Sequence, residues 1–205
     1  MPERPFTAAD LGERMTRLNA VQLANPFDMT FSAAGVPVVS DATGNGVAKE
    51  TSTGQTTFFH RFDRIKMDDG SDIEAVPTGI ERVGDEYLVT LTGGCPYPPE
   101  SGRLVAIDEA RNERAVVDGL NMPIDVVTDE DGTIWVLEFG RFDEEGSCFS
   151  GAGYLPNTGR LSQVVDGGIV PVLTELNFPA GMALTAMGVR ISARCSGGVC
   201  CALIG

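Results

Sequence analysis

The stretch from Pro123 to Glu138 alternates between inward and outward positions on both sides of an Asp131–Gly132 turn. Ile124 and Val126 point one way and the residues between them the other, and a second alternating run, 134–138, follows the turn. Both runs carry apolar residues on both faces, which is typical of a small sheet covered on each side by other sheets. The pattern therefore predicts a two-stranded unit that needs neighbours for stability.

The same pattern recurs along the chain. A proline, then Asp or Gly two residues later, then an apolar alternating strand occur four times, at Pro26, Pro77, Pro123 and Pro179. A glycine-led third strand and a fourth strand follow, with the glycines at Gly46, Gly102 and Gly159. Four strands at a period of roughly 50 residues are the signature of propeller blades.

We therefore predict an all-β chain forming a partial β-propeller, with about three four-stranded blades and the start of a fourth over residues 25–185. The inner strands are expected to start near Phe27, Thr78, Ile124 and Ala180. Residues 1–24 are expected to form a short amphipathic helix, because apolar residues recur there at helical spacing.

Composition limits the partners. The chain has 205 residues, 25 Gly, 12 Pro and a net charge of -14. Nucleic acid and anionic membranes would be repelled by this charge, so neither is expected as a partner. No run approaches the roughly 20 apolar residues of a membrane span, and residues 1–20 lack the apolar core of a signal peptide.

Several motifs carry a family resemblance. "NPFDMTF", "VPTGI", "CPYPPESGRL" and "MPIDVVTDEDGTIWVLEFG" together resemble the ScyD/ScyE family of β-propellers with NHL-type repeats, over roughly four fifths of the chain. The resemblance implies a six-bladed, exported propeller, located outside the cell or in the periplasm. It implies no particular reaction, because the activity of that family is not established.

The C-terminal segment departs from the repeat. Residues 186–205 abandon the blade pattern and hold three of the five cysteines. Reading the neighbouring frame from Ala186 can restore a blade-like sequence, so we expect this tail to be out of frame after a one-base deletion. Three blades and a fraction cannot close a ring, so the chain is also expected to be truncated.

Two cysteines follow the second strands of consecutive blades. Cys95 lies in "GGCPYPP" and Cys148 in "GSCFSG". Loops at equivalent places on adjacent blades face the same end of a propeller, so a disulfide between these cysteines is plausible in an exported protein. Two unpaired thiols are the alternative. Neither cysteine has a partner at zinc-binding spacing.

Four acidic residues occupy repeated positions. Asp28 and Asp125 lie two residues after a proline, where Gly79 and Gly181 stand in the other repeats, and Asp41 and Glu138 end second strands. Asp28 and Asp125 are candidates for a divalent cation such as calcium, or for a polar ligand, at the mouth of the central channel. The alternative is that each carboxylate only accepts hydrogen bonds from its own turn.

The expected function is a binding or scaffold module for a small molecule or a protein. Ligand contacts are expected first in the loops "GGCPYPPES" and "RFDEEGSCFSGAGYLPNT". The alternative is a metal-dependent, lactonase-like hydrolase on a gluconolactonase-type propeller, which needs three or four converging ligands. Binding is favoured over catalysis mainly because only Asp28 and Asp125 align as candidate ligands, which is too few. His60 is also the only histidine, so a catalytic triad would have to be built on it alone. No cofactor is expected beyond that cation.

Overall fold

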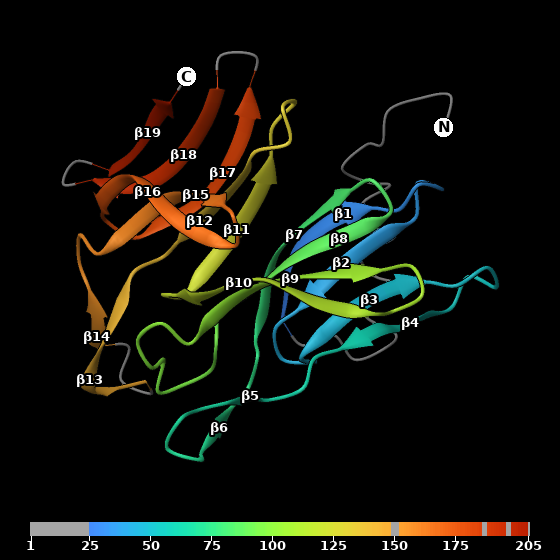
Figure 1. The fold of residues 1–205 in the computed structure, drawn as a ribbon, viewed down its shortest axis with the longest axis horizontal. Coiled ribbons are helices and arrows are strands. Elements are labelled where there is room, and N and C mark those ends of the chain that lie inside the picture. The colour runs from blue at the N-terminus through green and yellow to red at the C-terminus, as the bar shows by residue number, and fades with distance from the viewer. Residues whose placement is uncertain (1–24, 149–151, 186–187, 196–197, 205) are drawn as a thin grey trace.

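A computed structural model describes residues 25–148, 152–185, 188–195 and 198–204. Within these ranges the regular elements are all β-strands, and none of the described residues forms a helix long and apolar enough to cross a membrane. The prediction of an all-β, partial propeller is confirmed (Figure 1). The predicted helix in residues 1–24 lies outside the described residues.

Three antiparallel sheets have four strands each. Blade 1 contains β1 (Pro26–Phe31), β2 (Pro37–Asp41), β3 (Gly46–Glu50) and β4 (Thr56–Arg61). Blade 2 contains β7 (Pro77–Val83), β8 (Glu86–Leu91), β9 (Gly102–Asp108) and β10 (Glu113–Leu120). Blade 3 contains β11 (Pro123–Thr128), β12 (Ile134–Glu138), β15 (Gly159–Val165) and β16 (Gly168–Leu176).

A fourth sheet has three strands, and two small hairpins are the remaining elements of the described residues. Blade 4 contains β17 (Pro179–Thr185), β18 (Gly188–Cys195) and β19 (Gly198–Ile204). The hairpins are β5 (Ile65–Lys66) with β6 (Asp72–Ile73), and β13 (Arg141–Ser147) with β14 (Ala152–Leu155). Much of the predicted tail thus continues the fourth sheet, while its proposed origin in a shifted reading frame remains a prediction.

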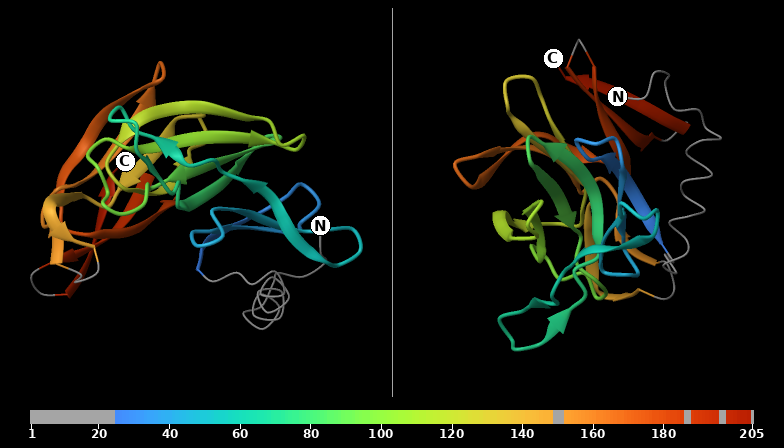
Figure 2. Two further views of the ribbon diagram at one scale, coloured as in Figure 1. Left: turned by 90° about the horizontal axis from the view of Figure 1, so that it is seen from below. Right: turned by 90° about the vertical axis from the view of Figure 1, so that its right-hand side faces the viewer.

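The first strand of each blade is its inner strand. β1 lies against β7, β7 against β11, and β11 against β17, so the four inner strands follow one another around a common centre. Figures 1 and 2 show the sheets fanned out from this centre as an arc. Each inner strand begins at its proline, one residue before the predicted start.

The core lies between the blades. Blades 1 and 2 bury a cluster that includes Val38, Phe59 and Tyr87, and blades 2 and 3 bury one that includes Leu104 and Val136. A third cluster fills the space between blades 3 and 4. Because every described blade except those at the ends of the arc packs on both faces, its strands need apolar residues on both faces.

The repeated glycine and proline of the sequence meet in space. An added Cβ atom at Gly102 would lie 2.3 Å from Cδ of Pro123, and one at Gly159 would lie 2.7 Å from Cδ of Pro179. In blades 2 and 3 glycine therefore starts the third strand because the proline of the next blade occupies the space of a side chain. Gly46 of blade 1 differs, because an added Cβ atom there would lie 2.5 Å from the carbonyl oxygen of His60.

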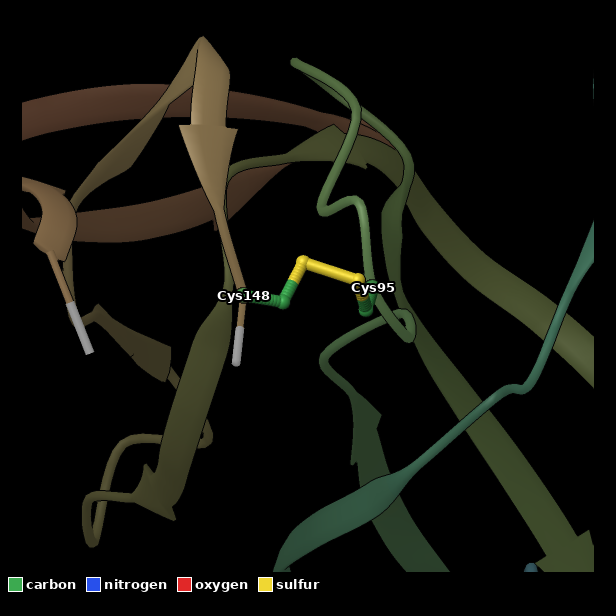
Figure 3. The surroundings of a disulfide bond; sticks show 2 residues. All are labelled: Cys95 and Cys148. Carbon is green, nitrogen blue, oxygen red and sulfur yellow. A yellow bond between two sulfur atoms is a disulfide. The ribbon is translucent and has the colours of Figure 1, made fainter. Parts of the chain in front are cut away.

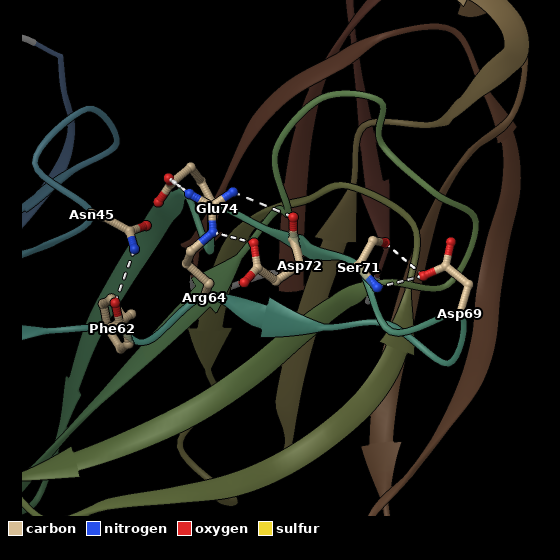
Figure 4. A network of polar contacts seen from close by, with 7 residues as sticks. All are labelled: Asn45, Phe62, Arg64, Asp69, Ser71, Asp72 and Glu74. Atoms are coloured by element: carbon tan, nitrogen blue, oxygen red, sulfur yellow. Dashed lines mark hydrogen bonds and ion pairs between the residues drawn. The ribbon is translucent and has the colours of Figure 1, made fainter.

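The β5–β6 hairpin connects blade 1 to blade 2 (Figure 4). At its base Asn45 donates from Nδ2 to the carbonyl of Phe62 at 2.9 Å, and its Oδ1 accepts from the N–H of Val76 at 2.9 Å. Arg64 pairs with both Asp72 and Glu74. The two Asn45 hydrogen bonds hold both ends of the connection against blade 1, and the Arg64 ion pairs join the two sides of the connection to each other.

The outermost strand of blade 3 has an apolar and irregular edge. On β16 the side chains of Val170 and Val172 are 48% and 42% exposed. Pro171 stands between them, and the pairing of β16 with β15 shifts register at Leu161 and Ser162, opposite this region. A proline in a sheet is confined to edge strands and bulges, which fits this position.

Candidate functional site

A pocket lies where the inner strands begin. Its volume is about 480 Å³. Each inner strand contributes the residue that directly follows its proline, namely Phe27, Thr78, Ile124 and Ala180. Strand alternation places these four positions on one side of the strands, so the repeat itself builds the floor of this central pocket. The lining is predominantly apolar.

An aromatic wall completes the central pocket. Tyr97 comes from the loop after β8, Tyr154 from β14, and Phe139 from the end of β12. The ring centroids of Tyr97 and Tyr154 are 5.9 Å apart, and those of Phe139 and Tyr154 are 5.5 Å apart in an edge-to-face arrangement. Phe142 packs behind this wall, 5.0 Å from Tyr154. Such geometry is favourable for aromatic pairs.

A disulfide joins the two loops that carry this wall (Figure 3). Cys95 and Cys148 are bonded, with a Cα–Cα distance of 6.1 Å, and lie 53 residues apart in sequence. The two cysteines are therefore paired, and the alternative of two unpaired thiols does not apply. Tyr97 follows Cys95 by two residues, so the bond lies beside the pocket wall.

The polar groups in the pocket are mostly satisfied. The hydroxyls of Thr78 and Thr92 donate to the carbonyl of Pro123 at 2.8 and 2.5 Å. Burial, together with the neighbouring hydroxyl of Tyr97, raises the pKa of Tyr154 to about 12. The Tyr154 phenol is therefore a neutral hydrogen-bond donor at physiological pH.

Asp28 and Asp125 do not line the central pocket and connect neighbouring blades instead. Asp28 accepts the N–H of Met29 at 2.7 Å and the N–H of Ile80, in blade 2, at 2.9 Å. Asp125 accepts the N–H of Val126 at 2.9 Å and that of Met182, in blade 4, at 2.7 Å. In each carboxylate, one oxygen thus accepts a hydrogen bond from its own strand and the other accepts one from the next inner strand.

The environment of Asp125 disfavours its charge. Burial raises the pKa of this carboxyl to about 7, and the negative charges of Asp28 and Glu81 add to the effect. The hydrogen bonds from Met182 and Val126 act in the opposite direction but do not outweigh burial. Burial also raises the pKa of Asp28.

Asp41 and Glu138 are fully buried at the ends of β2 and β12. Asp41 accepts the N–H of Asn25 at 3.1 Å and also that of Gly44. Glu138 accepts the N–H of Asn121 at 2.5 Å and forms a two-point ion pair with Arg160, with Nη2 at 2.9 Å from Oε1. Both acids hold the chain that enters the inner strand of their own blade.

The four predicted acids are therefore not gathered around one point. Among the described residues, no three His, Cys, Asp or Glu side chains are placed to hold one metal ion. The proposal that Asp28 and Asp125 bind calcium remains a prediction. His60 lies on β4 and contacts Glu113 of β10 at 2.8 Å, in the outer strands and away from the central pocket.

Solved structures with similar folds are β-propellers. Virginiamycin B lyase from Staphylococcus aureus matches with a TM-score of 0.55 and 14% identity over 86% of this chain and 54% of its own. A gluconolactonase from Xanthomonas campestris matches with a TM-score of 0.54 and 14% identity over 86% of this chain and 61% of its own. At such identities the likeness shows the fold alone.

A third match comes from a nidogen–laminin complex, with a TM-score of 0.60 and 17% identity over 87% of this chain and 60% of that chain. This chain thus spans 54% to 61% of the lengths of these three structures. No family model and no curated protein matches the sequence. The chain is defined as a β-propeller protein with an aromatic pocket at the centre of the blades, and the ScyD/ScyE resemblance rests on its sequence motifs.

The residues of the aromatic wall were not predicted as site residues from the sequence. Tyr97 and Tyr154 lie in the two loops where ligand contacts were expected, but neither residue was named as a site residue. Arg160, the partner of Glu138, was also missed. Aromatic residues beside a pair of bridging cysteines are the signal that points to such a wall.

Proposed function

We propose that this protein is a binding module that holds an uncharged, largely apolar small molecule in the central pocket. The observation that carries the proposal is the pocket itself, about 480 Å³ in volume, with an apolar floor from four blades and an aromatic wall from two loops. Small-molecule sites are commonly concave, apolar and of this size, with a few polar groups that fix orientation.

The net charge of the protein and the protonated hydroxyl of Tyr154 support an uncharged ligand. The net charge of -14 repels anions. No Asp, Glu, Lys, Arg or His is among the described residues that line the pocket, so a charged ligand would lose its hydration without gaining a partner. Tyr154, with a pKa of about 12, can donate a hydrogen bond to a neutral acceptor.

Export and a protein partner stay part of the same proposal. The ScyD/ScyE resemblance supports a location outside the cell or in the periplasm, and a disulfide between Cys95 and Cys148 suits such an oxidising place. The nidogen–laminin match names a propeller found in a protein complex. A partner for this chain would have to be found by experiment.

A lactonase-like hydrolase is the second candidate, because gluconolactonases are among the similar folds. Asp125, whose pKa is raised to about 7, is the carboxyl best suited to proton transfer. Its two oxygens are occupied by backbone N–H groups, however, and it does not line the central pocket. Binding is therefore the better supported function.

The test uses the 205-residue protein and N-phenyl-1-naphthylamine, an uncharged aromatic probe that fluoresces in apolar sites. We expect saturable binding at one site. Phe27 is 48% exposed and lines the pocket, so Phe27→Ala should weaken binding about tenfold without loss of the fold. Val170→Ala is the matched control, because Val170 is also 48% exposed but lies on β16, away from the pocket.

Equal weakening by Phe27→Ala and Val170→Ala, or no saturable binding by the parent protein, would contradict the proposed site. Hydrolysis of glucono-δ-lactone is measured on the same samples with added Ca²⁺. Turnover that disappears in Asp125→Ala would favour the hydrolase over the binding module.

A further inference from the structure

The wall of the central pocket depends on two segments that no sheet joins. Tyr97 belongs to the loop between β8 and β9 of blade 2, and Tyr154 belongs to the β13–β14 hairpin inserted in blade 3. The Cys95–Cys148 disulfide is the covalent link between these two segments (Figure 3). The wall is thus assembled across a boundary between blades.

In the described residues, the β13–β14 hairpin is not paired with a strand of any blade. It forms a two-stranded sheet of its own, separate from blade 3. At its base the N–H of Arg141 donates to Oγ1 of Thr158 at 2.8 Å, which ties the hairpin only to its own blade. Towards blade 2 it packs through the aromatic contacts of Tyr97 with Phe142 and Tyr154, at 5.3 and 5.9 Å. A lone hairpin of this kind is marginally stable in water.

One end of the disulfide lies at an exposed residue. Cys95 is exposed and Cys148 is half-buried. An accessible disulfide exchanges with an external thiolate much more readily than a buried one, because the attacking sulfur must approach one of the two sulfur atoms. Access to Cys95 is therefore the open route.

We propose that the Cys95–Cys148 disulfide is a thiol-sensitive clamp on the central pocket: its reduction frees the β13–β14 hairpin, separates Tyr154 from Tyr97 and releases the bound ligand. The clamp rests on the proposed function, since it regulates the same pocket. The blades themselves keep their fold on reduction, because the clusters between them do not include the hairpin.

The exchange balances with a dithiol as the reductant. One thiolate of the dithiol attacks Sγ of Cys95, a new S–S bond forms, and Cys148 leaves as a thiolate that takes up a proton. The second thiolate of the dithiol then attacks the other sulfur of the same dithiol, which is bonded to Cys95 in the mixed disulfide. Cys95 leaves as a thiolate and takes up a proton. Two electrons pass from the dithiol, which becomes a cyclic disulfide, to the protein.

The experiment titrates N-phenyl-1-naphthylamine into the oxidised 205-residue protein and into the same protein reduced with dithiothreitol. We expect reduction to weaken binding at least tenfold. Mass spectrometry after alkylation verifies that Cys95 and Cys148 are reduced. Far-ultraviolet circular dichroism of the same samples reports whether the blades stay folded.

The double variant Cys95→Ser/Cys148→Ser is the control. It should bind the probe as weakly as the reduced parent, with or without dithiothreitol. The three other cysteines, Cys195, Cys200 and Cys201, are unchanged in this variant. A response of the double variant to dithiothreitol would trace the effect to those cysteines and overturn the clamp.

Two further outcomes also overturn the clamp: unchanged probe binding after complete reduction, and loss of the β-sheet circular dichroism on reduction, which would make the bond a staple of the whole fold. If the oxidised protein binds no probe, the proposed function fails separately. The clamp is then read by hydrogen–deuterium exchange over residues 141–155, where faster exchange on reduction supports it and unchanged exchange contradicts it.

Discussion

Blades 1 and 3 carry different residues from blade 2 at the equivalent positions near the proline of the inner strand. Two residues after the proline, blades 1 and 3 have Asp28 and Asp125, which accept N–H groups from the next blade, whereas blade 2 has Gly79. Opposite the proline, blade 3 pairs Pro123 with the buried Glu138, whereas blade 2 pairs Pro77 with Leu91. Equivalent backbone positions therefore carry different chemistry in alternate blades.

Blade 2 uses hydroxyls in place of carboxylates. Thr78, Thr90 and Thr92 are buried together, and the hydroxyls of Thr90 and Thr92 each lie 2.9 Å from that of Thr78. The hydroxyls of Thr78 and Thr92 also donate to the carbonyl of Pro123. The repeated acids of blades 1 and 3 therefore cross-link the fold, Asp28 and Asp125 between blades and Asp41 and Glu138 within a blade. A row of like residues along a repeat does not by itself make a converging set of ligands.

The largest effect is expected from Arg160→Ala in blade 3. Glu138 is buried, with 1% of its side chain exposed, and would lose its ion-pair partner. Breaking a buried pair in this way costs about 3 to 5 kcal/mol of the free energy of unfolding, measured by urea denaturation. Burial already raises the pKa of Glu138, so the loss should become smaller as the pH falls and the carboxyl takes up a proton.

The matched control is Arg103→Ala in blade 2. Arg103 pairs with Leu91 across the sheet, as Arg160 pairs with Glu138, but its ion pair with Asp118 is exposed. Exposed pairs contribute about 0 to 1 kcal/mol. Equal costs for the two substitutions would erase the difference between the blades that we describe.

Gly79→Ala should have the next largest effect. A Cβ atom at this position would lie 2.5 Å from Cα of Asp125 and 2.9 Å from the carbonyl oxygen of Ile124. Since both are backbone atoms, blades 2 and 3 would have to separate, at a cost of about 2 to 3 kcal/mol in thermal or urea unfolding.

Gly181→Ala is the control for this change, because it has the same place in blade 4. Its added Cβ atom would meet only Oδ2 of Asp125, at 3.5 Å, which is an ordinary contact. We expect a change below about 1 kcal/mol. A cost as high as that of Gly79→Ala would show that close approach of the next blade is not what requires glycine.

The third prediction concerns pH. The pKa of Asp125 is about 7 in the folded protein, whereas the ordinary pKa of an aspartate side chain is 3.8. Between these values the folded state binds more protons than the unfolded state, so stability should fall as the pH rises from 4 to 7. Partial contact with solvent reduces the loss to roughly 2 kcal/mol.

Urea denaturation at several pH values measures this slope, and Asp125→Asn should make it shallower. The Asp28→Asn variant is the comparison, because the pKa of Asp28 is raised in the same direction by burial. If the stability of the parent protein instead rises steadily from pH 4 to 7, the buried carboxyls are not the groups that dominate its pH dependence.

The smallest effect is expected from Thr92→Val in blade 2. The substitution keeps the shape of the side chain and removes one of the two hydroxyls that donate to the carbonyl of Pro123. Because Thr78 still donates to that carbonyl, the loss should be about 1 kcal/mol. Thr57→Val, at an exposed position of β4, should change stability by less than that.

Much of the fold follows from local patterns. Alternation of apolar residues predicts the strands, and the prolines predict where the inner strands begin, because a proline can start a strand but cannot donate within it. The β5–β6 hairpin was not predicted, because its strands have two residues each and leave no periodic signal. Short elements of this kind depend on contacts such as those of Arg64, which the sequence does not reveal.

The candidate pocket was only partly readable from the sequence. The two long loops in which we expect ligand contacts supply Tyr97 and Tyr154 to its wall, and the contacts themselves remain a prediction. The acids were placed at the channel mouth because they share a repeat position, but a period along one strand does not tell which backbone N–H of the next blade a carboxylate meets. That depends on the offset between blades, which only the three-dimensional packing sets.

Pro171 has a consequence for how copies of this chain meet in concentrated solution. An apolar edge strand is a template for fibre growth when its row of N–H and C=O groups is continuous and flat. On β16 the proline removes one N–H from that row, and the shift in register bends the strand beside the exposed Val170 and Val172. The outer edge of blade 3 can therefore be apolar and still be a poor template for amyloid growth.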